Sequence, residues 1–377
     1  MAVGNNENEN INTSKEKGRK TPRDLELTGS FVETTRKTEK KARPPTYLET
    51  HANNYAKKEL ANAFGTIQRW APMFRSDLEE MNKGKIGTPY KFSDSMIWWL
   101  LCIMTVTDSD FRFISGFFSG LFPLFGLRSP SFSRLNERCS ELIARMLDAV
   151  DGAPKERYGD HVLAIHVCAN VIERIRRAGI DASGINMSNT NLWRVKKWQT
   201  SPKNRGWLVL HALCDVDTGE ILAYAITDET VGDAPMLRVL VEAATEKGHV
   251  FDKLYADGAY SSDENWILLC RERKIGFVTS FKSNTRPTNN GSVARGEAAR
   301  LWCSLTYDEW VKASGYGVRW KCECVFSDLK RLFPETITAM SNNGILRQLC
   351  SRIEVFNRYK ITRAGIMGVT GNGVTVA

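Results

Sequence analysis

Two aspartates stand where apolar segments end. Asp181 follows the apolar residues 178–180, and Asp257 follows the predicted strand 253–256 and precedes Gly258. Converging carboxylates can hold two divalent ions about 3.5–4 Å apart, and such ions activate the attacking oxygen and stabilise the leaving oxygen of a phosphodiester. Each aspartate taken singly is better explained as a turn or cap residue, so a third acid is needed before the pair predicts chemistry.

A third acid lies on a predicted helix, within a stripe of polar residues. Tyr316, Arg319, Glu323 and Lys330 fall within roughly 60° of one another on a helical wheel. The stripe places a carboxylate between two cations and a phenol, which suits a metal held beside a phosphate backbone. A solvated helix face with an Arg319–Glu323 pair explains the same pattern equally well.

The spacing of this stripe, Tyr-(2)-Arg-(3)-Glu-(6)-Lys, resembles the signature of the DDE transposases of prokaryotic insertion sequences, in the insertion sequence four and five groups. Asp181-Ala-Ser-Gly184 resembles the first-acid motif of that family, and Tyr255-Ala-Asp-Gly-Ala-Tyr260 resembles its second. The resemblance covers about residues 85 to 365 and includes further landmarks in family order, at segments 89–94, 130–134, 211–223 and 326–331.

The resemblance implies an α/β fold, namely an RNase H-like mixed sheet flanked by helices. It implies acids on the first strand, the fourth strand and a later helix, and the metal-binding catalytic triad would be Asp181, Asp257 and Glu323. The implied cofactor is a pair of Mg²⁺ ions, with Mn²⁺ as a second option. DNA contacts would come from Tyr316, Arg319 and Lys330.

The chain departs from the family pattern at a few positions, none of which removes a carboxylate. Ala182 and Ser183 replace the usual Ser-Thr, and Val209 stands where many relatives carry a lysine. Only about 65 residues separate Asp257 from Glu323, so the large β insertion of some relatives is expected to be absent or much reduced.

The charge of the chain favours a polyanionic partner. Its 377 residues include 52 Lys and Arg against 43 Asp and Glu, which gives a net charge of +9. No acid occurs from Asn186 to Cys214, and cations alternate there with Trp193, Trp198 and Trp207, as in phosphate and base contacts. The acid-free loop 282–295 resembles a second DNA-facing stretch, although a solvated loop with core tryptophans remains an alternative for these signals. The cations of the first stretch predicted to bind DNA are Arg194, Lys196, Lys197, Lys203 and Arg205.

Four parts are predicted along the chain. Residues 1–45 carry almost no large apolar side chain, so a disordered polar tail is expected. Residues 46–155 show helical spacing, with Ser93 as N-cap of a helix over 94–104. Arg134 and Arg138 on the last predicted helix favour a helix-turn-helix DNA-binding domain, and a generic bundle with solvated arginines fits equally well. The RNase H-like catalytic domain is predicted over 156–365, and a flexible tail over 366–377.

The predicted elements of the catalytic domain follow the order of a mixed sheet with helices. Residues 178–185 are predicted to be a strand that ends in a tight turn, and 207–214 and 220–226 a hairpin. Further strands are predicted over 253–256 and 275–281, and helices over 233–247, 263–274, 318–332 and 345–362.

Together these features predict a DNA transposase that cuts the ends of its mobile element and joins the 3′-OH ends to target DNA. Expected partners are double-stranded DNA (terminal inverted repeats and target) and a second copy of the chain when DNA is bound, without a membrane; a cytoplasmic, nucleoid-associated protein is expected. The alternatives are a catalytically silent DNA-binding derivative and another RNase H-like nuclease. Nine cysteines without a C-x-x-C pair, and His161 and His166 at a spacing untypical of zinc sites, predict reduced thiols and no structural metal.

Overall fold

The computed structural model describes residues 67–147, 153–169, 175–187, 208–288 and 291–366, together with Asn54 and Lys58. The predicted tail 1–45 and residues 367–377 of the predicted C-terminal tail lie outside the described residues. So does the basic segment that carries Arg194, Lys196, Lys197, Lys203 and Arg205.

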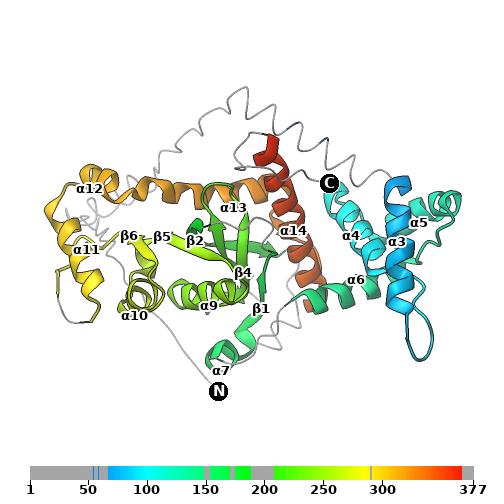
Figure 1. Ribbon diagram of the computed structural model, residues 1–377, viewed down its shortest axis with the longest axis horizontal. Helices are drawn as coiled ribbons and strands as arrows, with labels where there is room; N and C mark the ends of the chain where they lie inside the picture. The colour runs from blue at the N-terminus through cyan, green and yellow to red at the C-terminus, as the bar shows by residue number, and fades with distance from the viewer. Residues whose placement is uncertain are drawn as a thin grey trace, which may run out of the picture. The chain divides into compact units, whose positions relative to one another are not determined.

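In the part of the chain that the structure describes, the sheet has seven strands: β1 (Val162–Val167), β2 (Ile175–Met187), β3 (Leu208–Asp215), β4 (Ile221–Asp228), β5 (Val250–Ala256), β6 (Gly276–Thr279) and β7 (Thr336–Ile337). Their order is β1-β4-β3-β2-β5-β6, and β7 pairs with the last residues of β2. The pairs from β1 to β2 are antiparallel, and β2, β5 and β6 run parallel (Figure 1). This mixed sheet flanked by helices confirms the RNase H-like fold class.

Two details of the predicted sheet are wrong. The edge strand β1 was not predicted, because Val-Leu-Ala-Ile-His-Val is a short, nearly continuous apolar run that carries no clear period. The acids therefore lie on the second and fifth strands of the chain instead of the first and fourth. The tight turn after Asp181 is also absent, because antiparallel pairing with β3 continues from Ala182–His211 to Ile185–Leu208 and keeps β2 extended.

The two faces of the sheet are covered by different helices. One face packs against α9 (Asp233–Glu246), whose buried side chains include Met236, Leu237 and Leu240. The other face packs against α13 (Trp320–Leu332) and α14 (Asn342–Ile366). Figure 1 shows α9 and α13 on opposite sides of the strands. The middle of the sheet is therefore covered on both faces, which explains why β4 is buried at every position.

Among the described residues, four α-helices pack together ahead of the sheet, namely α3 (Ile67–Asn82), α4 (Asp94–Thr107), α5 (Phe111–Leu121) and α6 (Phe132–Met146), and the short α7 (Ala153–Tyr158) leads into β1. Ser93 caps α4 as predicted, with its side chain accepting from Met96 N at 3.2 Å. The buried residues of these helices continue into the core formed with α14, which contacts α4 and α6. None of the described helices is both long and apolar enough to cross a membrane.

Helices connect the last parallel strand to α13. After β5 come α10 (Asp263–Trp266) and a π-helical turn (Ile267–Glu272), which together replace the single helix predicted over 263–274. α11 (Val293–Ser304) and α12 (Tyr307–Ser314), which were not predicted, lie between β6 and the 3-10 turn η5 (Tyr316–Arg319) that leads into α13. Between β6 and α13 the described residues form helices and loops without a strand, as expected for a chain without the large β insertion.

Candidate active site

The first two predicted acids lie side by side at one end of the sheet. β2 and β5 run parallel, and the last pair in register is Ile180–Ala256, so Asp181 and Asp257 are the next residues on the two strands. Neighbouring strands are about 4.8 Å apart. The parallel pairing therefore brings together two carboxylates that are 76 positions apart in the sequence.

Divergence of the two strands beyond this pair gives the carboxylates room. β2 continues along β3, whereas the chain after β5 turns away at Asp257 into a short 3-10 helix, Gly258–Tyr260. That turn is fixed by bonds to Asp257 itself: its side chain accepts from Ala259 N at 3.2 Å, and its carbonyl accepts from Thr279 Oγ1 at 2.7 Å. Asp257 is consequently exposed at the end of its strand.

The third predicted acid reaches the same place from α13. Arg319 forms ion pairs with both Glu323, one turn later, and Asp181, whose Oδ2 lies 3.9 Å from Arg319 Nη1. The side chain of Glu323 is 55% exposed and that of Asp181 is 20% exposed. The structure therefore brings Asp181, Asp257 and Glu323 to one solvent-open region, with a guanidinium between two of them.

The surroundings of Asp181 change its proton affinity. Burial raises the pKa of the Asp181 carboxyl, while the N–H of Ala182 and the charge of Arg319 act in the opposite direction. Glu323 and Asp257 raise this pKa further, because carboxylates of like charge repel one another. A group of acids that repel one another in this way favours the binding of cations.

Of the other two residues of the predicted stripe, Tyr316 is buried away from an open face, whereas Lys330 follows Glu323 by seven positions on α13 and lies on the same helix face. Tyr316 is 8% exposed, its ring lies 4.8 Å from that of Trp310, and its hydroxyl donates to Ser280 Oγ at 3.3 Å. Lys330 pairs with Glu335 at 2.7 Å. The continuous-helix assumption misplaces Tyr316, because residues 316–319 form a 3-10 turn whose side chains do not follow α-helical spacing.

A fourth acid near the site was missed in the sequence. Asp233 is the first residue of α9, and both burial and the charge of Asp257 raise the pKa of its carboxyl. Its Oδ1 lies 3.5 Å from Nδ1 of His211, a fully buried histidine whose pKa burial lowers to about 4. That histidine is neutral near pH 7, so it carries no positive charge that would offset a carboxylate at Asp233. Acids are common in the first turn of a helix, so the position of Asp233 in the sequence gives no signal of a functional role.

The three predicted acids suit hard cations. All their donor atoms are oxygens, which Mg²⁺ prefers, and the exposure of Asp257 and Glu323 leaves space for the waters that Mg²⁺ retains. The acids are not closed into a compact cage: among the described residues, only His166, Cys168 and Glu354 bring three potential ligand atoms within 4.8 Å of one another. The triad therefore resembles an open site that substrate oxygens complete.

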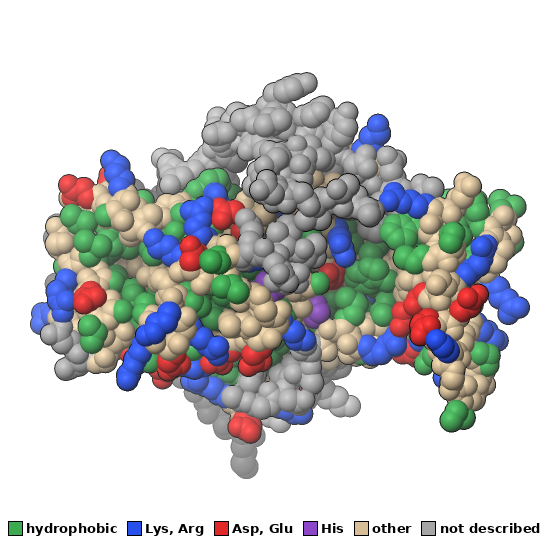
Figure 2. All heavy atoms as spheres, viewed as in Figure 1, with side chains coloured by type: hydrophobic (Ala, Val, Ile, Leu, Met, Phe, Trp, Pro, Cys, Tyr) green, Lys and Arg blue, Asp and Glu red, His purple; other side chains and the backbone are tan. Residues whose placement is uncertain are grey.

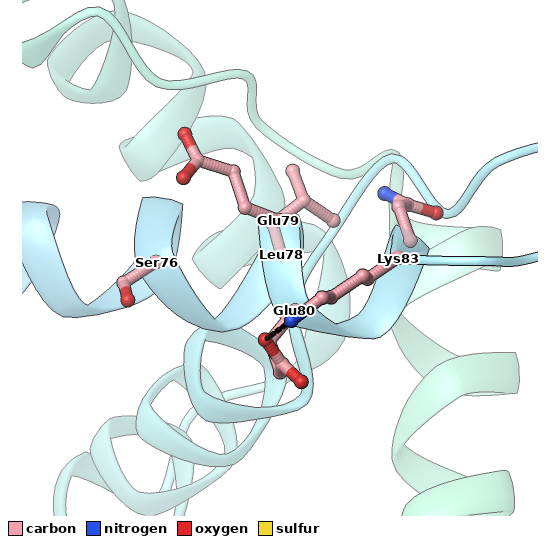
Figure 3. A pocket seen from close by; sticks show the side chains of 6 residues that line it. Ser76, Leu78, Glu79, Glu80 and Lys83 are labelled. Atoms are coloured by element: carbon pink, nitrogen blue, oxygen red, sulfur yellow. Dashed lines mark ion pairs between the residues drawn. The ribbon is translucent and has the colours of Figure 1, made fainter.

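Two other features of the described surface, the charge pattern of one face and a pocket on α3, do not form a second cluster of acids. On the face drawn in Figure 2, Lys and Arg side chains are scattered among Asp and Glu side chains. A shallow pocket lies on α3, remote in sequence from the acids, and Figure 3 shows Glu80 and Lys83 paired along its edge. That pair is 3.9 Å long with both side chains more than three-quarters exposed, as expected for a solvated helix pair of little energetic weight.

A comparison with known protein families gives a match that includes the three acids. Residues 175–353 match a family model described as a transposase DDE domain. The matched segment contains Asp181, Asp257 and Glu323, and the match supports a DDE transposase. No curated protein sequence matches the chain.

Among solved structures, the chain is similar to one described as the Drosophila P element transposase strand transfer complex. The identity is 9% and the TM-score is 0.29, over 80% of this chain and 85% of that chain.

Proposed function

We propose that this protein is a transposase of the insertion sequence four and five groups, which cuts the ends of its own mobile element and joins the freed 3′-OH ends to target DNA. The observation that carries the proposal is the convergence of Asp181, Asp257 and Glu323 on one solvent-open region, inside the segment that matches the transposase DDE domain. An exposed site of this kind suits a polymer substrate, which cannot enter an enclosed cavity.

The carboxylates would hold the metal, and nearby cations would hold DNA. Asp181, Asp257 and Glu323 would together supply the protein ligands of two Mg²⁺ or Mn²⁺ ions. When bound, such ions supply activation of the attacking oxygen, which is water in cleavage and the DNA 3′-OH in joining, and stabilisation of the leaving oxygen.

Arg319 would balance the charge of the acids before DNA binds and contact a phosphate afterwards, because its guanidinium already lies at their edge. Lys330 and the basic stretch with Arg194, Lys196, Lys197, Lys203 and Arg205 would add phosphate contacts along the duplex. Tyr316, which is buried against Trp310, would keep the start of α13 in place and reach DNA backbone only at its edge. The helices before residue 155 would bind the terminal repeats.

Both ends of the element must be cut together, so a DNA-bound dimer is the proposed active form, acting on the nucleoid in the cytoplasm. The inverted repeats that flank the gene would supply the substrate for a test. Purified protein, Mg²⁺ and a labelled duplex that carries these repeats allow cleavage, strand transfer and binding to be measured separately.

Asp257→Asn and Glu323→Gln should reduce cleavage and joining by about two orders of magnitude or more, since the ions contribute several kcal/mol to the barrier. Binding to the repeats should change little. Asp252→Asn, an exposed aspartate on the same strand as Asp257, is the matched control and should keep full activity.

Each alternative function predicts a different result in this assay. Wild-type protein that binds the repeats but never cuts would be a silent DNA-binding derivative. Cleavage without joining to a second duplex would indicate another RNase H-like nuclease. Loss of binding in parallel with cleavage in Asp257→Asn would contradict the catalytic role of the acid.

A further inference from the structure

Three side chains of metal-binding type meet between the edge strand β1 and the helix α14. His166 lies near the end of β1, Cys168 follows two positions later on the same side of the extended chain, and Glu354 comes from the middle of α14. One potential ligand atom from each of the three lies within 4.8 Å of the other two. Sequence spacing could not reveal this group, because Glu354 is far from the other two residues in the chain.

The His166–Glu354 distance suits two ligands of one tetrahedral ion better than a direct hydrogen bond, and the Cys168 side chain is itself within hydrogen-bond reach of Glu354. His166 Nε2 and Glu354 Oε1 are 3.4 Å apart, which is longer than a good N–H···O hydrogen bond. Ligands at the usual Zn–N, Zn–O and Zn–S distances of about 2.0–2.3 Å lie roughly 3.3–3.8 Å from one another at tetrahedral angles. Glu354 Oε1 is also enclosed without a hydrogen-bond partner among the described residues, and a buried carboxylate oxygen in that state is costly.

Neighbouring residues fix the orientation of the group. The N–H of Cys168 donates to Leu222 O at 2.9 Å, and its carbonyl accepts from His249 Nε2 at 3.1 Å. The His166 ring lies 5.4 Å from the ring of Tyr224 on the adjacent strand. These contacts hold the sulfur and imidazole in place before any ion binds, as the outer contacts of metal sites commonly do.

We propose that His166, Cys168 and Glu354 bind one zinc-type divalent ion, with water as fourth ligand, and that this ion fastens α14 to the edge of the sheet. A thiolate and an imidazole favour Zn²⁺ over Mg²⁺, whose preferred ligands are oxygens. The side chains of His166 and Glu354 are 13% and 18% exposed, which leaves access for one water.

This site is distinct from the acid triad. β4 and β3 separate β1 from β2, where Asp181 lies, and all three ligands lie outside residues 175–353 that match the transposase DDE domain. α14 also contacts α4 and α6, and Arg347 donates to Asn136 Oδ1 at 2.7 Å. The ion would therefore stabilise the helix against which both the sheet and the N-terminal helices pack.

The test measures metal content and spectrum in the full chain. Protein purified without chelator should carry about one zinc per chain by mass spectrometry, and replacement with Co²⁺ should give a thiolate-to-cobalt charge-transfer band. Cys168→Ser should remove that band, and His166→Ala and Glu354→Gln should weaken zinc binding at least about tenfold. Cys303→Ser, an exposed cysteine elsewhere, should leave content and band unchanged.

Two further measurements keep the test decisive. Asp257→Asn should retain the zinc, which separates this site from the acid triad and from failure of the proposed function. Removing the ion from wild-type protein with a chelator should lower the melting temperature, and Zn²⁺ but not Mg²⁺ should restore it, even if Cys168→Ser does not fold. Wild-type protein that takes up no stoichiometric zinc or cobalt, or a cobalt band that survives in Cys168→Ser, would overturn the proposal.

Discussion

Gly179 of β2 lies directly against Cys322 of α13: a Cβ atom added to the glycine would stand 2.0 Å from the Cys322 sulfur and 3.2 Å from Val216 Cγ1. Gly179 precedes Asp181 by two positions on the strand, and Cys322 immediately precedes Glu323 on the helix. This single contact therefore sets the distance between the strand and the helix that carry two of the three acids.

Replacing Gly179 with alanine should separate α13 from β2. No real Cβ approaches a sulfur so closely, so the helix must move, and overpacking of this kind costs about 1–3 kcal/mol. Because Glu323 would move with the helix, metal-dependent cleavage should fall by more than the loss of folded protein explains. Urea denaturation and a cleavage assay at equal folded concentration would measure the two effects.

A second substitution can test that explanation. Cys322→Ala removes the sulfur, so the double variant should regain most of the stability and cleavage lost in Gly179→Ala. Gly116→Ala, at a helical glycine with nothing within 4 Å of its added Cβ, is the matched control and should be neutral or slightly stabilising. A double variant no better than the single one would show that the damage lies elsewhere.

The parts of the fold that the sequence could predict are those set by local pattern. Ser93 and the apolar spacing after it predict α4, and turn residues at 215–219 predict the β3–β4 hairpin, because caps and turns depend on neighbouring residues. Asp181 and Asp257 could be paired because each directly follows an apolar segment, and the two segments lie in register as neighbouring parallel strands.

What the sequence could not predict depends on contacts between distant residues. The extended course of β2 beyond Asp181 is dictated by hydrogen bonds to β3, not by the residues Ala-Ser-Gly, which favour a turn. The burial of Tyr316 depends on Trp310 and Ser280, which α12 and the loop after β6 supply. The proximity of Glu354 to His166 likewise depends on how α14 packs across the sheet.

Arg319 should control the pH range of cleavage. Its charge lowers the pKa of Asp181, which burial raises, and the metal requires the ionised carboxylate. Activity should therefore fall on the acid side as Asp181 takes up a proton. Arg319→Gln removes the cation, so this acid limb should move to higher pH, whereas Arg319→Lys should keep it close to the wild-type position.

A pH profile of cleavage at subsaturating Mg²⁺ would measure that shift. Arg331→Gln is the control, because Arg331 is 72% exposed on the same helix and pairs with Asp328. If Arg319→Gln lowers the rate of cleavage but leaves the pH at which activity falls on the acid side unchanged, Arg319 acts through phosphate contact alone.

The two arginines predicted to mark a DNA-reading helix should behave differently. Arg138 is 3% exposed and pairs with Asp94 of α4 at 2.6 Å and with Glu141 at 2.7 Å. Arg138→Ala should therefore destabilise the helices by about 2–3 kcal/mol, somewhat below the usual cost of breaking a buried pair because Asp94 keeps Arg145 at 2.7 Å. Chemical denaturation would measure the loss.

Arg134 is the matched comparison on the same helix. It is 44% exposed and pairs only locally with Glu137, so Arg134→Ala should change stability by about 0.5 kcal/mol or less. If α6 contacts DNA, Arg134→Ala should remove about one phosphate contact. The slope of log binding constant against log salt concentration should then become shallower by about one unit. An unchanged salt slope would argue against DNA contact by this arginine.

Asp233 should tune metal affinity without binding the metal itself. Its carboxylate at the start of α9 interacts with the charge of Asp257, so Asp233→Asn removes a negative charge from the edge of the site. The Mg²⁺ concentration for half-maximal cleavage should rise about threefold to tenfold, which corresponds to roughly 0.7–1.4 kcal/mol of lost attraction, while the rate at saturating Mg²⁺ should change little. Glu246→Gln, at the opposite end of the same helix, is the control and should leave the Mg²⁺ dependence unchanged. Added Mg²⁺ can compensate for a weaker electrostatic attraction at the site but not for a missing ligand. If Asp233→Asn is as inactive as Asp257→Asn at every Mg²⁺ concentration, Asp233 is instead a direct ligand of the metal.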